Sequence, residues 1–312
     1  MAGLPQRHDL LRKRLERFTR LLPGVQEGDI TALHRTRVAS RRLRELLPIL
    51  QLDQHDAEKL GKRLRKVRSH LGMVRELDVL LLLIDELHES RRQDRPALKR
   101  IGDDIRRERA HAREKLIDKK LPSSELQKIA RKLDRTLRGV EKEDARATSQ
   151  SPARGWKWVL DARIARRAAA VRKAIDAAGA VYLPDRLHEL RISVKKLRYA
   201  VELSAEAQGQ TSTPQLKVLK RCQELLGHIN DLHVLIDRIR QAQASLNPPN
   251  IAVWRELDAL TTVVENSCRR FHGRYMHQRP ALEGAVEQLV AKAQRGERAA
   301  ESARAAAGRA VI

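Results

Sequence analysis

The chain has 312 residues, of which 64 are lysine or arginine and 40 are aspartate or glutamate, so its formal net charge is +24 at pH 7. A protein this basic is expected to bind a polyanion, and a hydrophobic content of 41% excludes a wholly disordered basic tail. The two cysteines, Cys222 and Cys268, form no CxxC pair and could make at most one bridge, so the sequence suggests neither a disulfide framework nor a thiolate metal site.

Helical periodicity dominates the chain and the alternating patterns of strands are missing, so we predict an all-α fold. Proline and glycine mark most breaks between the predicted helices. In the first half, helices are predicted over 7–22, 29–50, 56–70, 72–92, 95–119 and 122–143. In the second half, they are predicted over 157–178, 185–206, 214–225, 228–245, 251–276 and 281–305.

Two segments bear on the location of the protein, and two others are predicted to be a linker and a frayed end. Arginines interrupt the apolar residues of segment 1–22, and the apolar run 79–84 is far shorter than the roughly 20 residues that span a bilayer, so we expect a cytoplasmic protein without a membrane span. Residues 146–156 are polar and are predicted to link a first helical bundle, 1–145, to a second, 157–312. The Ala/Arg-rich end, Arg295–Ile312, is expected to fray.

The two halves repeat each other. The run Leu33-His34-x-x-Arg37-x-x-x-Arg41-Arg42-Leu43-Arg44 recurs as Leu187-His188-x-x-Arg191-x-x-x-Lys195-Lys196-Leu197-Arg198. A second stretch, with Lys62, Arg65, Lys66 and Leu71-Gly72, recurs as Lys217, Lys220, Arg221 and Leu226-Gly227. Because order, spacing and chemistry are kept, we interpret the halves as tandem copies of one unit.

Each copy places its cations on one helical face. On a helical wheel, His34, Arg37, Arg41 and Arg44 fall within a stripe of about 80°, opposite the leucines. No acid lies between positions 34 and 44, which argues against a solvated face neutralised by neighbouring acids, and the stripe is expected to be exposed. The candidate polyanion-binding residues are His34, Arg37, Arg41, Arg42, Arg44, Lys62, Arg65, Lys66, His188, Arg191, Lys195, Lys196, Arg198, Lys217, Lys220 and Arg221.

Several histidines and aspartates allow more than one role. His34 and His188 could each donate to a bound phosphate or hold a helix to its neighbour, and the residues favour neither role. Asp78 and Asp231 are expected to brace basic residues. Two weak metal-ligand groupings, His228 with Asp231 and His233, and His272 with His277, lack the spacing of a metal site. The chain has no phosphate loop, nucleophile elbow or HExxH helix, so we expect neither enzyme activity nor a cofactor.

These motifs resemble the CHAD family, the conserved histidine α-helical domain. The resemblance extends over almost the whole chain and includes Leu77-Asp78-Val79-Leu80 and Leu225-Leu226-Gly227-His228-Ile229-Asn230-Asp231, with Arg75-Glu76 a conservative departure. It implies two pseudo-symmetric helical bundles that bind inorganic polyphosphate through a basic surface, in some members on polyphosphate granules. The binding groove would then lie between or across the bundles, on 29–50, 185–206, 56–70 and 214–225. A triphosphate-processing enzyme or granule proteins would be separate partners.

Two other functions fit the charge. Non-specific nucleic-acid binding is the main alternative, but the cationic stripes carry no aromatic residue except Tyr199 at their margin, and they lack asparagine and glutamine for reading bases. A structural protein that coats storage granules is the other alternative. Of the two cation types, arginine is expected to position phosphates through its planar fork, whereas lysine chiefly adds potential.

Overall fold

The computed structural model describes residues 5–90, 95–118, 123–150, 155–246 and 250–309. Over these residues the secondary structure is helical and includes no strand, which confirms the predicted all-α fold. The elements in order are α1 (Arg7–Arg20), α2 (Leu22–Gln26), α3 (Ile30–Leu46), the 3-10 helix η1 (Leu47–Leu50), α4 (Gln54–His70), α5 (Gly72–Ser90), α6 (Arg95–Asp118), α7 (Ser123–Gln150), α8 (Gly155–Ala178), α9 (Pro184–Ala207), α10 (Pro214–Ala244) and α11 (Ile251–Arg309). None of the described helices is both long enough and apolar enough to cross a bilayer.

Side-chain caps define where the central helices begin. The Asp29 carboxylate accepts hydrogen bonds from the backbone N–H groups of Thr31 and Ala32, at 2.9 and 3.1 Å, and so starts α3. Asp53 caps α4 in the same way, and Thr213 caps α10. Gly179 follows α8 with φ +60°, a left-handed conformation that ends a helix at low cost only in glycine. Local chemistry therefore fixes where α3, α4 and α10 begin and where α8 ends.

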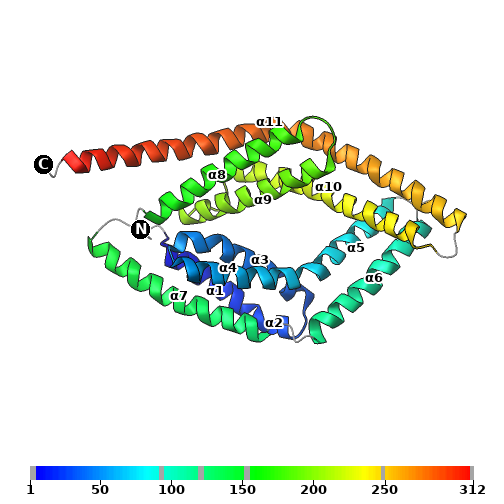
Figure 1. Cartoon of the computed structure of the whole chain (residues 1–312), viewed down its shortest axis with the longest axis horizontal. Helices are drawn as coiled ribbons and strands as arrows, with labels where there is room; N and C mark the ends of the chain where they lie inside the picture. Colours follow the sequence, from blue (N-terminus) through cyan, green and yellow to red (C-terminus); the bar gives the residue numbers. More distant parts are fainter. Residues whose placement is uncertain (1–4, 91–94, 119–122, 151–154, 247–249, 310–312) are drawn as a thin grey trace.

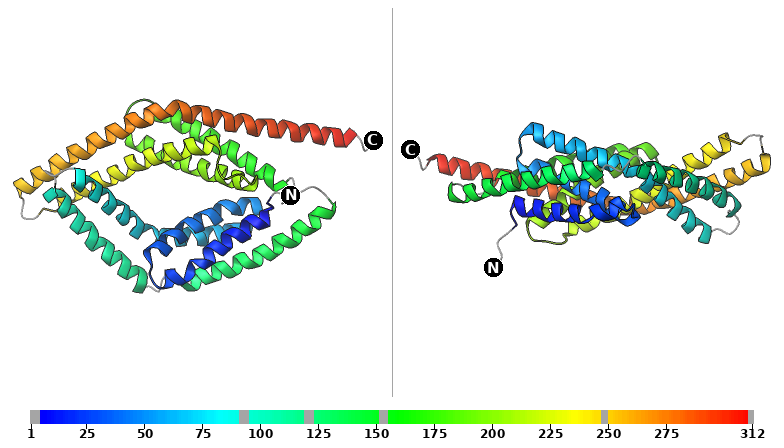
Figure 2. Two further views of the ribbon diagram at one scale, coloured as in Figure 1. Left: turned by 180° about the vertical axis from the view of Figure 1, so that it is seen from behind. Right: turned by 90° about the horizontal axis from the view of Figure 1, so that it is seen from below.

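The two halves meet at two places (Figure 1). Near the middle of the molecule, α3 and η1 of the first half contact α9 and α8 of the second. At the far corner, α5 and α6 contact α10 and α11. The ribbons of the two halves thus outline a four-sided body, and the view from below shows that this body is thinner than it is wide (Figure 2).

Each hydrophobic core draws side chains from both halves. In the larger core, side chains of the first-half helices α1 through α4 and α7 pack with side chains of α8, α9, the start of α10 and the middle of α11. The smaller core joins α5 and α6 with the end of α10 and the start of α11. Because apolar burial is the main stabilising term in folding, these shared cores hold the halves in a fixed relation.

Several predicted helix boundaries were wrong. The predicted break at 226–227 is absent, because α10 continues through Gly227 between the buried side chains of Leu226 and Ile229. Glycine in a helix costs only about 1 kcal/mol, less than the burial of these two side chains contributes. The predicted break near Pro280 is also absent. Arg279 donates to the carbonyl of Gly179 at 2.7 Å and so anchors α11 where the proline removes a backbone donor.

Other boundaries moved by part of a turn or more. The predicted helix 7–22 ends at Arg20 and a short α2 follows, with Pro23 in its first turn. The predicted helix 29–50 tightens into η1 at Pro48. Helix α7 continues to Gln150, into the predicted linker 146–156, of which 151–154 lie outside the described residues. The tail expected to fray is helical to Arg309, and 310–312 lie outside the description.

Candidate polyanion-binding site

Helix α3 is placed so that its buried face orients its cations. Leu33 and Leu43 are buried in the larger core, together with the polar residues Thr36 and Ser40 on the same side. The helix packs against α1, α4 and α9. Arg37 and Arg41 lie off the buried face and are half-buried. The predicted amphipathic arrangement of this helix is therefore present.

Lys195 on α9 shows how closely the positive charges of the two halves approach one another. Burial and the charges of Arg191, Arg41, Arg68 and Arg37 lower the pKa of Lys195 to about 8. These arginines come from α9, α3 and α4, so charges on three helices from both halves act on one ammonium group. The shift follows because both desolvation and like charges disfavour the protonated form.

The same mutual repulsion extends along α3. Burial lowers the pKa of Arg44, and the charges of Arg68, Arg65 and Arg41 add to the effect. Burial also lowers the pKa of His34, with further repulsion from Arg75, Arg37 and Arg41. We refer to this group as the cationic cluster. It comprises His34, Arg37, Arg41, Arg44, Arg65, Arg68, Arg75, Arg191 and Lys195.

The carboxylates nearest to the cationic cluster are mostly engaged by other arginines. Glu45 binds Arg163 and Arg167 of α8, at 3.1 and 2.7 Å. Asp78 accepts a hydrogen bond from Arg109 of α6 at 2.6 Å, which confirms the predicted bracing role for this aspartate. Among the described residues, Glu76 approaches Arg37, but at 3.8 Å and with 74% of its side chain exposed. Such an exposed, long contact contributes little, so the cluster keeps a net positive charge.

The cluster is less exposed than predicted. Arg37, Arg41, Arg191 and Lys195 were expected to be exposed, yet all four are half-buried, and the Arg37 side chain is only 20% accessible. Arg41 lies 5.2 Å from the ring centre of Tyr199 and donates to its hydroxyl group. The helices packed around α3 cover the stems of these side chains, which a wheel of one helix cannot show. The Nε atoms of Arg37 and Arg41 are buried without a hydrogen-bond partner in the described part of the chain.

The last arginine of the second motif, Arg198, has side-chain partners that the repeat does not supply to its counterpart, Arg44. Arg198 donates to Gln223 at 2.7 Å and to Glu202, and its guanidinium lies over Tyr199. The repeat places Arg68 where the second copy has Gln223, and Pro48 where it has Glu202. The two partners of Arg198 are thus replaced in the first copy by Arg68 and Pro48, neither of which can accept a hydrogen bond from a guanidinium side chain through its own side chain. The surroundings of Arg44 and Arg198 therefore differ between the copies, although Arg191 and Lys195 of the second copy remain in the cationic cluster.

Several predicted site residues lie apart from the cluster. The Arg42 side chain lies toward α1 instead, and Lys196 is exposed beside α8, where its backbone carbonyl accepts from Arg167 at 2.6 Å. The remaining predicted lysines and one arginine are exposed on α4 and α10 without joining the group: Lys62, Lys66, Lys217, Lys220 and Arg221. Of the predicted α4 residues, Arg65 belongs to the cluster, because its charge helps to lower the pKa of Arg44.

Comparison with known proteins settles the family. A family model described as the CHAD domain matches residues 9–240, which is most of the chain. The chain belongs to the CHAD family. The family predicted from the repeated motifs is therefore confirmed.

Two solved structures share the fold of this CHAD chain. PptA from Streptomyces chartreusis aligns with a TM-score of 0.55 and 19% identity, over 91% of this chain and 97% of its own. The CHAD domain from the plant Ricinus communis aligns with a TM-score of 0.55 and 18% identity, over 90% of each chain. No curated protein matches the sequence.

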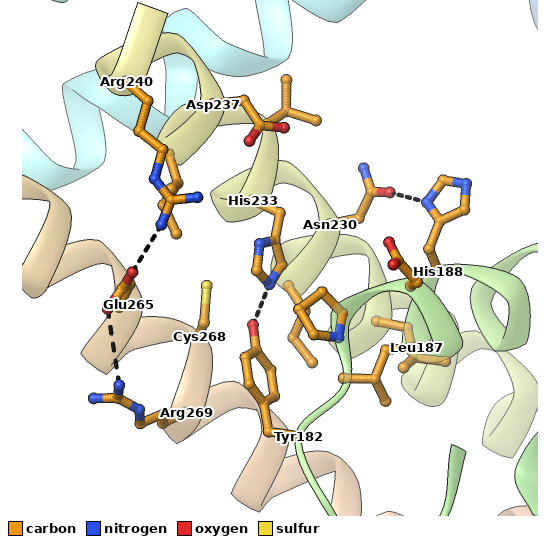
Figure 3. A pocket seen from close by; sticks show the side chains of 16 residues that line it. Tyr182, Leu187, His188, Asn230, His233, Asp237, Arg240, Glu265, Cys268 and Arg269 are labelled. Carbon is orange, nitrogen blue, oxygen red and sulfur yellow. Dashed lines mark hydrogen bonds and ion pairs between the residues drawn. The ribbon is translucent and has the colours of Figure 1, made fainter. Parts of the chain in front are cut away.

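The second histidine of the CHAD motif has a local partner. The Nδ1 atom of His188 lies 2.6 Å from the side-chain oxygen of Asn230, an arrangement that ties α9 to α10 (Figure 3). The repeat places Arg75 where the second copy has Asn230, and Arg75 repels His34 instead. The two histidines therefore differ. His188 has a helix-tying contact, whereas His34 faces cations and borders the cluster.

His188 also lines a hollow that is separate from the cationic cluster. This hollow of about 580 Å³ lies between α9, α10 and α11 and mixes acids with bases. Glu265 bridges Arg240 and Arg269 there, at 3.3 and 3.8 Å, while Tyr182 and His233 are hydrogen-bonded to each other (Figure 3). A polyanion gains little from such a balanced lining, so this larger hollow is a poor match for the predicted ligand.

The weak metal groupings do not come together. The His228 ring stacks on Phe271 with centroids 4.8 Å apart, whereas His233 binds Tyr182. Asp231 accepts from Asn230 at 3.2 Å and does not brace a basic residue in the described contacts. No group of three or more potential metal ligands is present among the described residues.

The stability of the protein should report the repulsion at Lys195. In the unfolded chain its pKa is near 10.5, so between about pH 8 and 10.5 the unfolded state binds more protons and stability rises with pH. Below pH 8 the full penalty is present. We expect Lys195→Met to raise the free energy of unfolding at pH 7 by about 2 kcal/mol, allowing for screening of a half-buried group, and by much less at pH 10. Urea unfolding at both pH values measures this, with the exposed Lys196→Met as control. An equal gain at both pH values would show that charge is not the cause.

Proposed function

We propose that this CHAD protein binds inorganic polyphosphate on the cationic cluster. The observation that carries the proposal is the set of half-buried cations from both halves, with Lys195 surrounded by four arginines. Gathering like charges in this way costs stability, and a bound polyanion removes the cost. Asp78 and Glu45 are held by other arginines, and the one acid paired with the cluster in the described contacts, Glu76, is exposed and 3.8 Å from Arg37.

The chemistry of the cluster suits a phosphate chain without bases. Arginine predominates, and its planar fork can hold two phosphate oxygens at once. The Nε atoms of Arg37 and Arg41 have no hydrogen-bond partner in the described contacts, so neither guanidinium group is fully satisfied within the protein. Polyphosphate is flexible and carries about one charge per phosphate, so it can follow cations that lie on three helices.

Nucleic acid is a weaker fit to the same residues. Tyr199 is the aromatic residue of the site, but it is only 8% exposed and is covered by Arg41 and Arg198. It therefore offers no face on which a base could stack. The exposed Trp158 and Trp254 lie on α8 and α11, which carry no residue of the cationic cluster. Backbone contacts alone would give binding without sequence preference.

We propose a binding role without catalysis. A hydrolase needs a group that activates water, and Asp78 and Glu45 are bound to arginines while Glu76 is exposed and approaches Arg37. Association with polyphosphate granules would follow from binding itself. Incubation of the protein with polyphosphate, followed by an assay for released phosphate, tests the absence of catalysis. Release above that of a heat-treated sample would overturn this part of the proposal.

Competitive titration tests the ligand. We expect long-chain polyphosphate to bind more tightly than single-stranded or double-stranded DNA of equal charge at about 150 mM salt, where charges beyond roughly 8 Å are screened. The logarithm of the affinity should fall with the logarithm of the salt concentration, by roughly 0.7 for each phosphate contacted if polyphosphate behaves as single-stranded nucleic acid does. Fluorescence anisotropy with labelled ligands gives both quantities. Equal or tighter DNA binding would replace polyphosphate by nucleic acid as the ligand.

A further inference from the structure

A basic hollow lies on the side of α3 that faces α1. It has a volume of about 520 Å³ and lies between α1 and α3, which pack against each other in the first half (Figure 1). This volume is within the range of about 300–1,000 Å³ that is usual for small-molecule sites. Its lining residues are Arg14, Arg17, Arg20, Leu21, His34, Arg35, Val38, Ala39 and Arg42. We refer to it as the α1–α3 hollow.

The charged residues that line this hollow are all basic. Arg14, Arg17 and Arg20 follow one another along α1, and Arg35 and Arg42 face them from α3. Arg14 is only 8% exposed and is held in place by Glu206 of α9, at 2.6 Å, and by the carbonyl of Arg42, at 3.3 Å. Arg17, Arg20 and Arg35 are exposed and can turn toward a ligand. One fixed arginine with mobile arginines around it is suited to binding phosphate oxygens.

The hollow differs from the cationic cluster in having an apolar wall. Leu21, Val38 and Ala39 are half-buried and line it, and Ala39 packs against the larger core. Inorganic polyphosphate has no apolar part that would use such a wall. A ligand that uses both features needs phosphate groups joined to a flat, weakly polar body. Exposed guanidinium groups can also stack on the face of such a body.

We infer that the α1–α3 hollow is a nucleotide-binding site, with the base on the apolar wall and the phosphates on the arginines. His34 borders both this hollow and the cationic cluster, so it can contact either ligand. Burial and the surrounding cations lower its pKa, which leaves the ring neutral at pH 7 and able to donate one hydrogen bond. The inference does not depend on polyphosphate being the ligand of the cationic cluster.

Calorimetric titration of the whole chain with ATP, adenosine and tripolyphosphate, in the presence of EDTA, separates the parts of the ligand. We expect ATP to bind about tenfold more tightly than tripolyphosphate, as a base held on an apolar wall would give, and adenosine to bind weakly. Equal binding of ATP and tripolyphosphate would reduce the hollow to an anion patch and overturn the inference.

Two variants locate the site. Arg17→Ala, Arg20→Ala and Arg35→Ala together change exposed side chains, and we expect them to weaken ATP binding at least about tenfold while long-chain polyphosphate still binds. Val38→Lys keeps the charge positive but removes part of the apolar wall, so the preference for ATP over tripolyphosphate should fall toward one. Circular dichroism confirms that each variant is folded. Unchanged ATP binding in the triple variant would show that ATP binds elsewhere.

Discussion

Alanine at Arg37, Arg41, Arg191 and Lys195 together is expected to weaken polyphosphate binding at least about 100-fold while the protein stays folded. Each of these cations can make charge-assisted hydrogen bonds to phosphate, worth about 1.5–3 kcal/mol apiece and not strictly additive. Stability should change little, because the loss of Arg41 from the Tyr199 ring is offset by relief of repulsion at Lys195. Anisotropy with labelled polyphosphate measures the affinity, and urea unfolding measures the stability.

A charge-matched variant distinguishes the cationic cluster from the overall charge of the protein. Lys99, Arg100, Lys173 and Arg255 are exposed on α6, α8 and α11, and their replacement by alanine removes the same four charges. We expect this control to lose only a few-fold in affinity, since charges beyond roughly 8 Å are screened at 150 mM salt. Equal losses in the two variants would mean that net charge, and not the cluster, holds polyphosphate.

The sequence predicted the helices of the site better than the partners of its side chains. The wheel of residues 33–50 placed Arg37, Arg41 and Arg44 on one side of α3, and the structure confirms that side. The wheel describes one helix only, so it could not show that α4 and α9 half-bury these side chains. The repeat, in turn, selected only positions that carry a cation in both copies. Arg68 and Arg75 were not among the predicted site residues, because their counterparts in the second copy are Gln223 and Asn230.

That difference between the copies explains the uneven charge of the site. In the second copy, an amide contacts two basic residues of α9: Gln223 contacts Arg198 and Asn230 contacts His188. In the first copy, arginines stand in both places and repel the residues of α3. A pattern search that rewards similarity overlooks such positions. A comparison of charge between the copies would have revealed Arg68 and Arg75, because each stands where the second copy has an amide.

A buried carboxylate, Glu45, links the two halves of the protein. Glu45 at the end of α3 is only 6% exposed and binds Arg163 and Arg167 of α8. Arg167 also donates to the backbone carbonyl of Lys196 on α9, at 2.6 Å. The chain of contacts from α3 through α8 to α9 thus ends beside Lys195 and sets the distance between the cations of the two halves.

Glu45→Ala is expected to lower the free energy of unfolding by about 3–5 kcal/mol, because it leaves two half-buried guanidinium groups without their counterion. Polyphosphate binding should weaken as well, since α3 is no longer held against α8 and α9, although Glu45 itself repels the ligand. Urea unfolding and anisotropy measure the two effects, with the exposed Glu224→Ala as control. The double variant with Arg167→Met should regain part of the lost stability, because it removes one of the uncompensated charges. If Glu45→Ala instead bound polyphosphate more tightly at unchanged stability, the carboxylate would act only as a negative charge near the site, and the spacing of the cluster would depend on the apolar core alone.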